Sequence, residues 1–286
     1  PQHPLKQAGQ TKELRTMTDE PVLLIERDPD DAFVTLTMNR PDKLNALDLE
    51  LLDAIDDAVR GAQKDPEIRA IILTGAGRAF TTGFDLISDD FEMDTEGWRE
   101  DMSANCDRLR TIWSSEVPVI AAINGYALAG GLELAMCCDL AIAAEDAMLG
   151  EPEVRHASGP PSLMMPWTMP IRHVRWLMYT GDMVDGREAE RIHLVNRAVP
   201  ADQLMDETRR LARKLARMPG AAIKFAKASI NHQQETAGLT SSWLYNVEAI
   251  ASLHASEHGR HWMRKMRDEP LKDVLADREA PFRDLD

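Results

Sequence analysis

Residues 125–139 read GYALAGGLELAMCCD, and this stretch decides the fold more than any other part of the 286-residue sequence. Its small residues predict a tight turn that leads from a strand into a helix beginning near Gly130 or Gly131. The first NH groups of a helix have no intrahelical acceptor and lie at its positive end. Gly130 is therefore predicted to offer its NH to an anion or to a polarised carbonyl oxygen. Glu133, on the first turn, is either part of the same site or only a favourable first-turn charge.

A second loop has a similar composition. Residues 77–85 read GRAFTTGFD and follow a short apolar run at 70–73. That run is predicted to be a buried parallel strand, and parallel strands end at the same edge of a sheet. The second loop can therefore present another backbone NH beside Gly130. Two donors aimed at one oxygen form an oxyanion site, in which removing one donor typically costs about 3 to 4 kcal/mol of transition-state stabilisation.

Apolar runs farther along the chain extend the parallel sheet. They are predicted as strands at 117–123, 140–144 and 194–199. Helical or loop segments separate these runs, which indicates right-handed parallel crossovers and an α/β fold. Near the start of the chain, 22–26 and 33–38 form a predicted hairpin. Asp48 is then predicted to cap a helix that ends near Gln63 or Lys64.

Strand patterns vanish after Asp202, and helical patterns replace them. Helices are predicted at 204–216, 221–230, 242–254 and 258–266. The first sixteen residues show neither periodicity. We therefore predict three parts, namely a flexible tail at 1–16, a core with the active site at 17–215 and a C-terminal helical region at 216–286.

Composition limits the classes of function. The net charge of −15 argues against nucleic acid and against an anionic membrane surface as partners. No apolar run approaches the roughly 18 to 20 residues that span a bilayer. The polar first twenty residues show no secretory signal, so a cytoplasmic protein is expected. Cys106, Cys137 and Cys138 lack metal-ligand spacing and are expected to be buried apolar residues.

Six motifs are informative as a set. They are NRPDKLNAL at 39–47, GRAFTTGFDL at 77–86, VPVIAAINGYALAGGLELAMCCDLAIA at 117–143, GEPEV at 150–154, YTGDMVDGREAERIHLVNRAVP at 179–200 and REAPFRD at 278–284. Their order and spacing closely resemble the crotonase family, the enoyl-CoA hydratase/isomerase superfamily, over nearly all of the chain after the tail. The resemblance implies a crotonase-like spiral of strand–strand–helix (ββα) units with a C-terminal helical trimerisation region. It also implies a homotrimer or a dimer of trimers.

The resemblance assigns roles to individual residues. The NH groups of Phe84 and Gly130 would form the oxyanion hole for the thioester oxygen of an acyl-CoA, and Glu133 and Glu153 would move protons. One carboxylate would activate water for attack at C3 while the other protonates C2, so that a trans-2-enoyl-CoA is hydrated. Coenzyme A would enter as part of the substrate, and neither a metal nor a redox cofactor is expected.

Other readings of these acids stay open. Retention of both glutamates favours hydration over isomerisation, since isomerases resembling these enzymes commonly keep only one acid. The alternatives are an enoyl-CoA isomerase, a hydrolase that cleaves a C–C or thioester bond, and an acyl-CoA binder without catalysis. Glu153 is alternatively an ordinary loop carboxylate. Glu151 is expected to face away from the site, and Asp139 is expected to be a structural hydrogen-bonding residue.

The segment after Glu153 departs from the hydratase pattern. It reads VRHASGPPSLMMPWTMP at 154–170 and is expected to border the acyl pocket. Met164 and Trp167 add bulk, so this segment either fits an unusual acyl group or packs as core. His156 is either an additional acid or base at this place or a structural histidine.

The coenzyme A end of the substrate is assigned to two places. Arg40 and Lys43 lie in a loop that resembles the family's nucleotide-contacting region, and Phe282, with Arg278, belongs to the C-terminal segment. The alternative for both arginines is solvated surface charge. The acidic stretch 89–101 is expected to be a mobile rim of the acyl channel.

Overall fold

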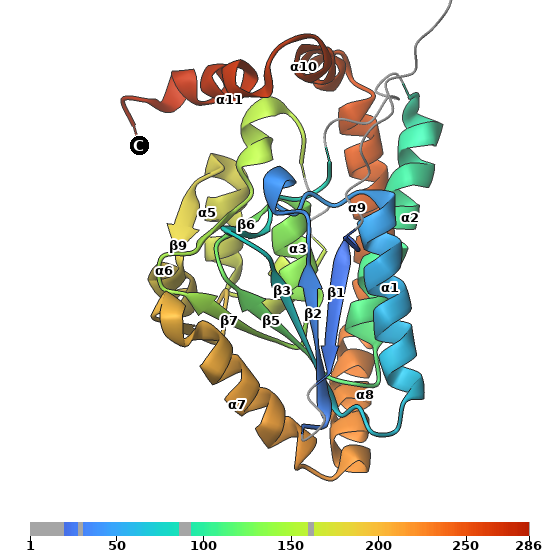
Figure 1. Ribbon diagram of the computed structural model, residues 1–286. Helices are drawn as coiled ribbons and strands as arrows, with labels where there is room; N and C mark the ends of the chain where they lie inside the picture. Colours follow the sequence, from blue (N-terminus) through green and yellow to red (C-terminus); the bar gives the residue numbers. More distant parts are fainter. Residues whose placement is uncertain (1–19, 28–30, 86–92, 160–162, 286) are drawn as a thin grey trace, which may run out of the picture.

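The strands of the protein form two sheets. The computed structural model describes residues 20–27, 31–85, 93–159 and 163–285. The larger sheet has the strand order β1-β2-β3-β5-β7-β10 and the smaller has the order β4-β6-β8-β9 (Figure 1). The larger consists of β1 (Leu23–Arg27), β2 (Phe33–Met38), β3 (Ala70–Gly75), β5 (Val119–Ile123), β7 (Leu140–Ala144) and β10 (Arg197–Val199). The smaller consists of β4 (Ala79–Thr81), β6 (Tyr126–Leu128), β8 (Met148–Gly150) and β9 (Met183–Asp185).

The pairing of the larger sheet follows the predicted order. Strands β1 and β2 form the expected antiparallel hairpin, with Leu23 opposite Met38. Strands β2, β3, β5, β7 and β10 are parallel neighbours in sequence order. Strands β3 and β5 are buried along their whole length, because both faces of this parallel sheet are covered, and such strands read as continuous apolar runs. The last strand is shorter than the predicted 194–199.

The chain repeats one pattern of strand, strand and helix. Strand β3 of the larger sheet is followed by β4 of the smaller sheet and then by α2 (Thr95–Ser114). Strands β5 and β6 and helix α3 (Gly130–Cys137) form the next unit. This repeat confirms the expected spiral of ββα units. The three-residue strands of the smaller sheet were not predicted from hydrophobic periodicity, since runs this short carry almost no periodic pattern.

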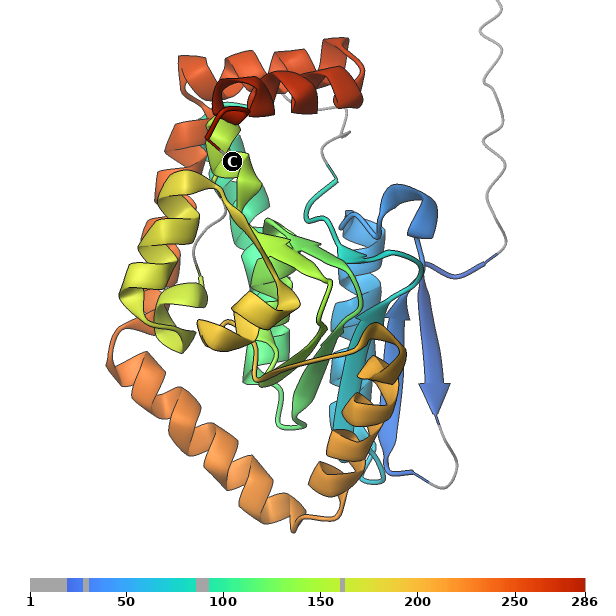
Figure 2. The same ribbon diagram turned by 90° about the vertical axis from the view of Figure 1, so that its left-hand side faces the viewer.

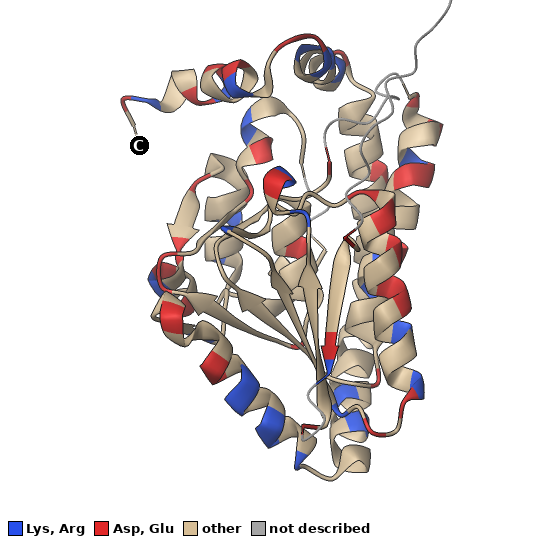
Figure 3. Ribbon diagram, viewed as in Figure 1, with Lys and Arg blue, Asp and Glu red and all other residues tan. Residues whose placement is uncertain are grey.

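The helices cover the sheets. Helix α1 (Leu49–Lys64) begins after Asp48, whose carboxylate accepts a hydrogen bond from the NH of Leu51 at 3.0 Å, which confirms the predicted cap. The shorter helical elements are η1 (Pro41–Lys43), η2 (Pro152–His156), α4 (Met165–Thr168), α5 (Ile171–Thr180), α6 (Gly186–Arg191), η3 (Ala201–Gln203) and η4 (Ala280–Phe282). Charged residues lie mainly on the helices, while the central strands carry almost none (Figure 3). An acid inside this core is therefore exceptional.

Part of the acidic stretch 89–101 is helical rather than a rim loop. Helix α2 begins at Thr95, and the carboxylate of Asp94 accepts a hydrogen bond from the NH of Gly97 at 2.9 Å. Acidic residues at this position satisfy the free NH groups and the positive end of the helix. That N-cap signal was overlooked in the sequence. Residues 89–92 lie outside the described residues.

The C-terminal part is helical, as predicted. Its helices are α7 (Leu204–Ala216), α8 (Gly220–Thr236), α9 (Leu239–His254), α10 (Glu257–Asp268) and α11 (Leu271–Glu279). Helix α11 was not predicted. Helices α10 and α11 lie across one end of the molecule in both views (Figures 1 and 2). The predicted tail 1–16 lies outside the described residues, and no helix in the described ranges is long and apolar enough to cross a membrane.

Candidate active site

Two loops meet at the N-terminal end of α3. A Cβ atom built on Gly83 would lie 3.0 Å from the carbonyl oxygen of Leu128 and 3.1 Å from the backbone nitrogen of Gly130. A Cβ atom on Gly130 would lie 2.6 Å from the ring of Phe84. Both glycines are therefore required by close approach of the loops rather than by turn formation alone. The sequence prediction that the two loops lie side by side is confirmed.

The NH groups of Phe84 and Gly130 have no hydrogen-bond acceptor among the described residues, although their neighbours are bonded. The NH of Leu47 donates to Gly83 at 2.8 Å, and the NH of Ala129 donates to the carbonyl of Gly150 at 3.0 Å. Gly130 is buried and Phe84 is half-buried, and buried backbone NH groups are nearly always paired, so these unpaired donors require an explanation.

The turn before α3 is strained. Ala129 has φ 55° and ψ −134°, a region that residues other than glycine rarely occupy. Such a conformation costs on the order of 1–3 kcal/mol and persists only where the surroundings fix it. Strand β6 fixes one side of this residue and α3 fixes the other. The strain turns the chain immediately before the NH of Gly130.

Glu133 lies on the first turn of α3 and is fully buried. Its Oε2 atom accepts a hydrogen bond from the NH of Met164 at 3.1 Å, while its Oε1 atom has no partner in the described part of the chain. Burial raises the pKa of Glu133 to about 8, against the opposing effect of the NH groups of Met164 and Leu163. A carboxyl group with this pKa exchanges its proton near neutral pH, as a general acid or base requires.

Glu153 lies next to a second buried carboxyl group, that of Glu151. Burial raises the pKa of Glu153 to about 7, while a hydrogen bond with Glu151 and the charge of Arg278 lower it. Glu151 was expected to face away from the site, and that prediction is wrong, because Glu151 is completely buried and the charges of Glu153 and Glu133 act on it. Glu151 is the N-cap residue of the tight turn η2, which contains Glu153.

Glu151 and Glu153 form a pair that can share a proton. Ionised carboxylates accept hydrogen bonds and cannot donate, so two of them bond to each other only when one is protonated. Burial, followed by the charges of Glu153 and Glu133, raises the pKa of Glu151 well above its usual range. Glu151 is therefore the carboxyl group of this pair that retains its proton to the higher pH. Residues 150–153, GEPE, place two acids around one proline, and this signal in the sequence could have identified Glu151.

His156 is buried at the end of the same turn. Neither ring nitrogen has a hydrogen-bond partner among the described residues, and the ring of Trp262 lies 5.8 Å away between centroids. Burial, with the charges of Arg278 and His254, lowers the pKa of His156 to about 3. The imidazole is therefore neutral at pH 7, which does not suit it to donate a proton as imidazolium.

Met164 and Trp167 lie on the Glu133 side of the site. The backbone of Met164 holds the Glu133 carboxylate, and its side chain is buried in the core. Trp167 packs against the core, and its NH donates to the carbonyl of Met164 at 2.9 Å. Both side chains thus pack in or against the core, which agrees with the core alternative for segment 154–170.

The residues predicted to hold coenzyme A lie in different surroundings. The guanidinium of Arg40 contacts the carboxylates of Asp48 at 2.7 Å and Asp85 at 3.3 Å, and its side chain is 12% exposed. Lys43 also contacts Asp85, at 3.2 Å, but is 47% exposed. The ring of Phe282 lies 4.3 Å from the guanidinium of Arg155, in a cation–π contact.

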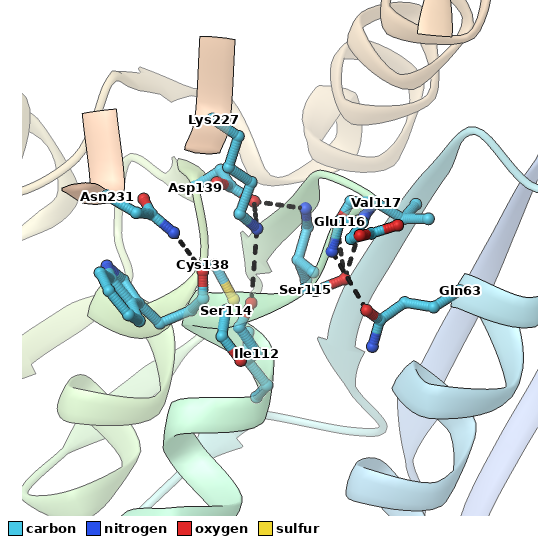
Figure 4. A network of polar contacts seen from close by, with 12 residues as sticks. Gln63, Ile112, Ser114, Ser115, Glu116, Val117, Cys138, Asp139, Lys227 and Asn231 are labelled. Atoms are coloured by element: carbon cyan, nitrogen blue, oxygen red, sulfur yellow. Dashed lines mark hydrogen bonds and ion pairs between the residues drawn. The ribbon is translucent and has the colours of Figure 1, made fainter. Parts of the chain in front are cut away.

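Asp139 belongs to a separate network, as expected for a structural residue. Its carboxylate accepts hydrogen bonds from the NH of Val119 at 2.8 Å and from Lys227 at 2.7 Å (Figure 4). Lys227 lies on α8, and Asn231 on the same helix donates to the carbonyl of Trp113 at 3.0 Å. These contacts connect the C-terminal helices to the core. The three cysteines are buried and free, as expected.

The fold and the site together define a class of protein. A ββα spiral that presents two free NH groups beside buried acids is suited to stabilise an oxyanion while protons move. The family model for enoyl-CoA hydratase/isomerase matches residues 29–267. The chain belongs to this family of enzymes, the crotonase superfamily. Within the described residues, no group of three or more histidine, cysteine or acidic side chains could hold a metal ion.

Individual relatives agree with this assignment. A probable enoyl-CoA hydratase of Mycobacterium bovis is 36% identical over 238 residues, which cover 82% of this chain and 90% of the relative. The crotonyl-CoA hydratase of Syntrophomonas wolfei is 32% identical and covers 91% and 97% of the two chains. A solved enoyl-CoA hydratase/isomerase from Xanthobacter autotrophicus Py2 is 32% identical, has a TM-score of 0.86 and covers 91% and 98%.

Proposed function

We propose that this protein is an enoyl-CoA hydratase that adds water to a trans-2-enoyl-CoA. The observation that carries the proposal is the pair of unpartnered NH groups, at Phe84 and Gly130, beside the buried acids Glu133 and Glu153. Two relatives described above carry the names probable enoyl-CoA hydratase and crotonyl-CoA hydratase. The family itself implies an acyl-CoA substrate.

The proposed reaction uses each group once. The thioester oxygen accepts hydrogen bonds from Phe84 and Gly130, so that negative charge developing on it is stabilised. One carboxylate removes a proton from water as the water oxygen bonds to C3, and the protonated carboxyl group delivers its proton to C2. The charge of Glu153 raises the pKa of Glu133, so ionisation of one carboxyl group disfavours ionisation of the other. The reaction requires one protonated and one ionised carboxyl group, and this repulsion favours that state.

We further propose a positioning role for Glu151. As a protonated acid it donates to Glu153, which holds that carboxylate in one orientation and stabilises its ionised form. Glu151 does not need to contact the substrate for this purpose.

We also propose which residues contact coenzyme A and how the protein assembles. We propose Lys43 as a phosphate contact because it is the more exposed base of its loop, with Arg40 holding the loop through Asp48 and Asp85. Phe282 is proposed to pack against the nucleotide. We propose assembly into a homotrimer or a dimer of trimers through residues 216–286, supported by large apolar side chains exposed on α8 and α9. They are Phe225, Ile230, Leu244 and Tyr245.

A panel of thioesters analysed by mass tests the reaction. Gain of one water by a trans-2-enoyl-CoA is the expected result. An unchanged mass with a moved double bond would identify an isomerase, and loss of coenzyme A or of a carbon fragment would identify a hydrolase. Absence of any reaction with all chain lengths, together with measurable binding, would support an acyl-CoA binder without catalysis.

A further inference from the structure

Three buried aromatic rings carry polar atoms that the proposed reaction does not use. In the described part of the chain, both ring nitrogens of His156, Nδ1 of His254 and Nε1 of Trp98 have no hydrogen-bond partner. Native proteins leave few such atoms, and each one lacking a partner costs about 1–3 kcal/mol. Unpaired nitrogens on these three rings indicate a ligand with hydrogen-bonding groups.

Two contacts of Ser158 connect His254 to the backbone of Glu153. The NH of Ser158 donates to the carbonyl of Glu153 at 3.2 Å, and the Ser158 hydroxyl lies 2.9 Å from Nε2 of His254. The ring of His254 in turn lies 4.6 Å from that of Trp98, edge to face. Trp98 Nε1 and His254 Nδ1 both lack partners within the described residues.

His156 lies in the same turn as Glu153. It follows Glu153 by three residues in the 3₁₀ turn η2, and side chains three apart in such a turn are eclipsed. The imidazole therefore projects from the same side of η2 as the Glu153 carboxyl group, and neither of its nitrogens has a partner among the described residues.

The proposed hydration leaves these rings without a task. Two acids and two NH groups suffice for the reaction, and none of the three rings is needed to move a proton. Burial lowers the pKa of His156 to about 3 and that of His254 to about 4, so both are neutral at pH 7. A neutral imidazole donates one hydrogen bond and accepts another, which matches a hydroxyl or keto oxygen. The three carboxyl groups nearby disfavour a carboxylate.

We propose that His156, with Trp98 and His254 beside it, forms a hydrogen-bonding subsite for a neutral oxygen substituent on the acyl chain of the substrate. The inference rests on the proposed function and names its substrate class, which is an enoyl-CoA whose acyl chain carries a hydroxyl or keto group beyond C3. A plain alkyl chain leaves the ring nitrogens unpaired. A site built for hydrogen bonds disfavours an analogue that lacks the partner.

A comparison of matched thioesters tests the subsite. We would measure kcat/KM for hex-2-enoyl-CoA, 6-hydroxyhex-2-enoyl-CoA, 5-oxohex-2-enoyl-CoA and hex-2-enedioyl-CoA. At least one of the neutral oxygenated substrates is expected to exceed the alkyl substrate by about 10-fold or more, as one well-made buried hydrogen bond allows. Equal values for the alkyl and both neutral oxygenated substrates, or a preference for the dicarboxylate, would overturn the inference.

Variants separate His156 from the rest of the site. His156→Phe is expected to lower the ratio of oxygenated to alkyl kcat/KM by about 10-fold while retaining turnover of the alkyl substrate. His156→Gln keeps a donor and an acceptor and should restore part of the ratio. The exposed His258 provides a matched control, because His258→Phe removes a histidine that contacts none of these groups. An unchanged ratio in a folded His156→Phe variant would contradict the subsite.

The inference can fail separately from the proposed function. If no thioester is hydrated, competitive binding of the saturated 6-hydroxyhexanoyl-CoA and hexanoyl-CoA still measures the subsite. Tighter binding of the hydroxylated thioester by about 10-fold supports the subsite even then, and equal binding rejects it.

Discussion

Two acidic regions of this molecule differ in how their charge is compensated. Asp139 has a lysine and a backbone NH as partners, and these contacts attach α8 to the core (Figure 4). The acids Glu133, Glu151 and Glu153 are buried with several oxygen atoms unpartnered among the described residues. In the first region a lysine of the protein neutralises the carboxylate. In the second region the acids have no such partner in the described part of the chain, which suits a catalytic role better than a stabilising one.

Removing an acid should therefore have opposite consequences in the two regions. Glu133→Gln is expected to lower kcat/KM for an enoyl-CoA by about 10³-fold, since a positioned acid or base contributes about 10²–10⁴-fold. Loss of enoyl absorbance measures the rate. The free energy of unfolding near neutral pH should stay equal or rise, because the amide replaces a buried ionisable group. A large loss of stability in Glu133→Gln with its activity retained would show that Glu133 stabilises the fold and is not needed for catalysis.

Substitutions in the Asp139–Lys227 ion pair should lower the stability of the protein and leave its activity unchanged. Lys227→Met leaves Asp139 without its cation and is expected to lower the free energy of unfolding by about 2 kcal/mol, between the values of exposed and fully buried pairs, because the Asp139 side chain is 23% exposed. Denaturant titration measures the loss. The double variant Asp139→Asn/Lys227→Met should recover part of it, and the folded fraction of either variant should keep its turnover.

The pH dependence of stability distinguishes the two kinds of acid. Glu133 and Glu153 have pKa values raised to about 8 and about 7 from a usual 4.5. Between these limits the folded state holds protons that the unfolded state has lost, so stability falls as pH rises. Each acid contributes about 1.4 kcal/mol per pH unit. Urea unfolding of the wild type and Glu133→Gln from pH 5 to pH 8 should show the variant gaining relative stability, and parallel curves would argue that Glu133 titrates normally.

The smallest expected effect concerns Glu151. Glu151→Leu removes the donor to Glu153 and should lower kcat/KM about fivefold, which corresponds to about 1 kcal/mol for one hydrogen bond. The acidic limb of the pH profile should move to higher pH, because the ionised form of Glu153 loses a stabilising donor. Glu151→Gln retains an NH donor and should restore the profile. A purely structural role for Glu151 would lower stability in both variants and leave the limb in place.

Much of the fold could be predicted from local signals. Asp48 identified the start of α1, and the β-branched run at 70–73 identified β3. The small residues before Gly130 identified the start of α3. The smaller sheet could not be found in this way, because its three-residue strands are defined by pairing with distant segments. Helix α11 is short, and its apolar residues Leu271, Val274 and Leu275 show helical spacing over a single turn, of which only Val274 is buried.

The candidate site was predictable to a different degree. The motifs located Gly130, Glu133 and Glu153, since these lie at the ends of recognisable elements. Glu151 was missed because its burial depends on the turn that Pro152 begins. The exposure of Lys43 and the carboxylate contacts of Arg40 depend on Asp85, more than forty positions away in the sequence.

The strained conformation of Ala129 has a consequence for timing. A glycine at this position would reach the same φ of 55° without the steric conflict of a Cβ atom, yet it would also reach many others. Alanine has fewer accessible backbone conformations than glycine, so the direction of the Gly130 NH is fixed when the chain folds. The energetic cost of aiming the proposed donor is then incurred once in the life of the molecule, and no catalytic cycle has to repeat it.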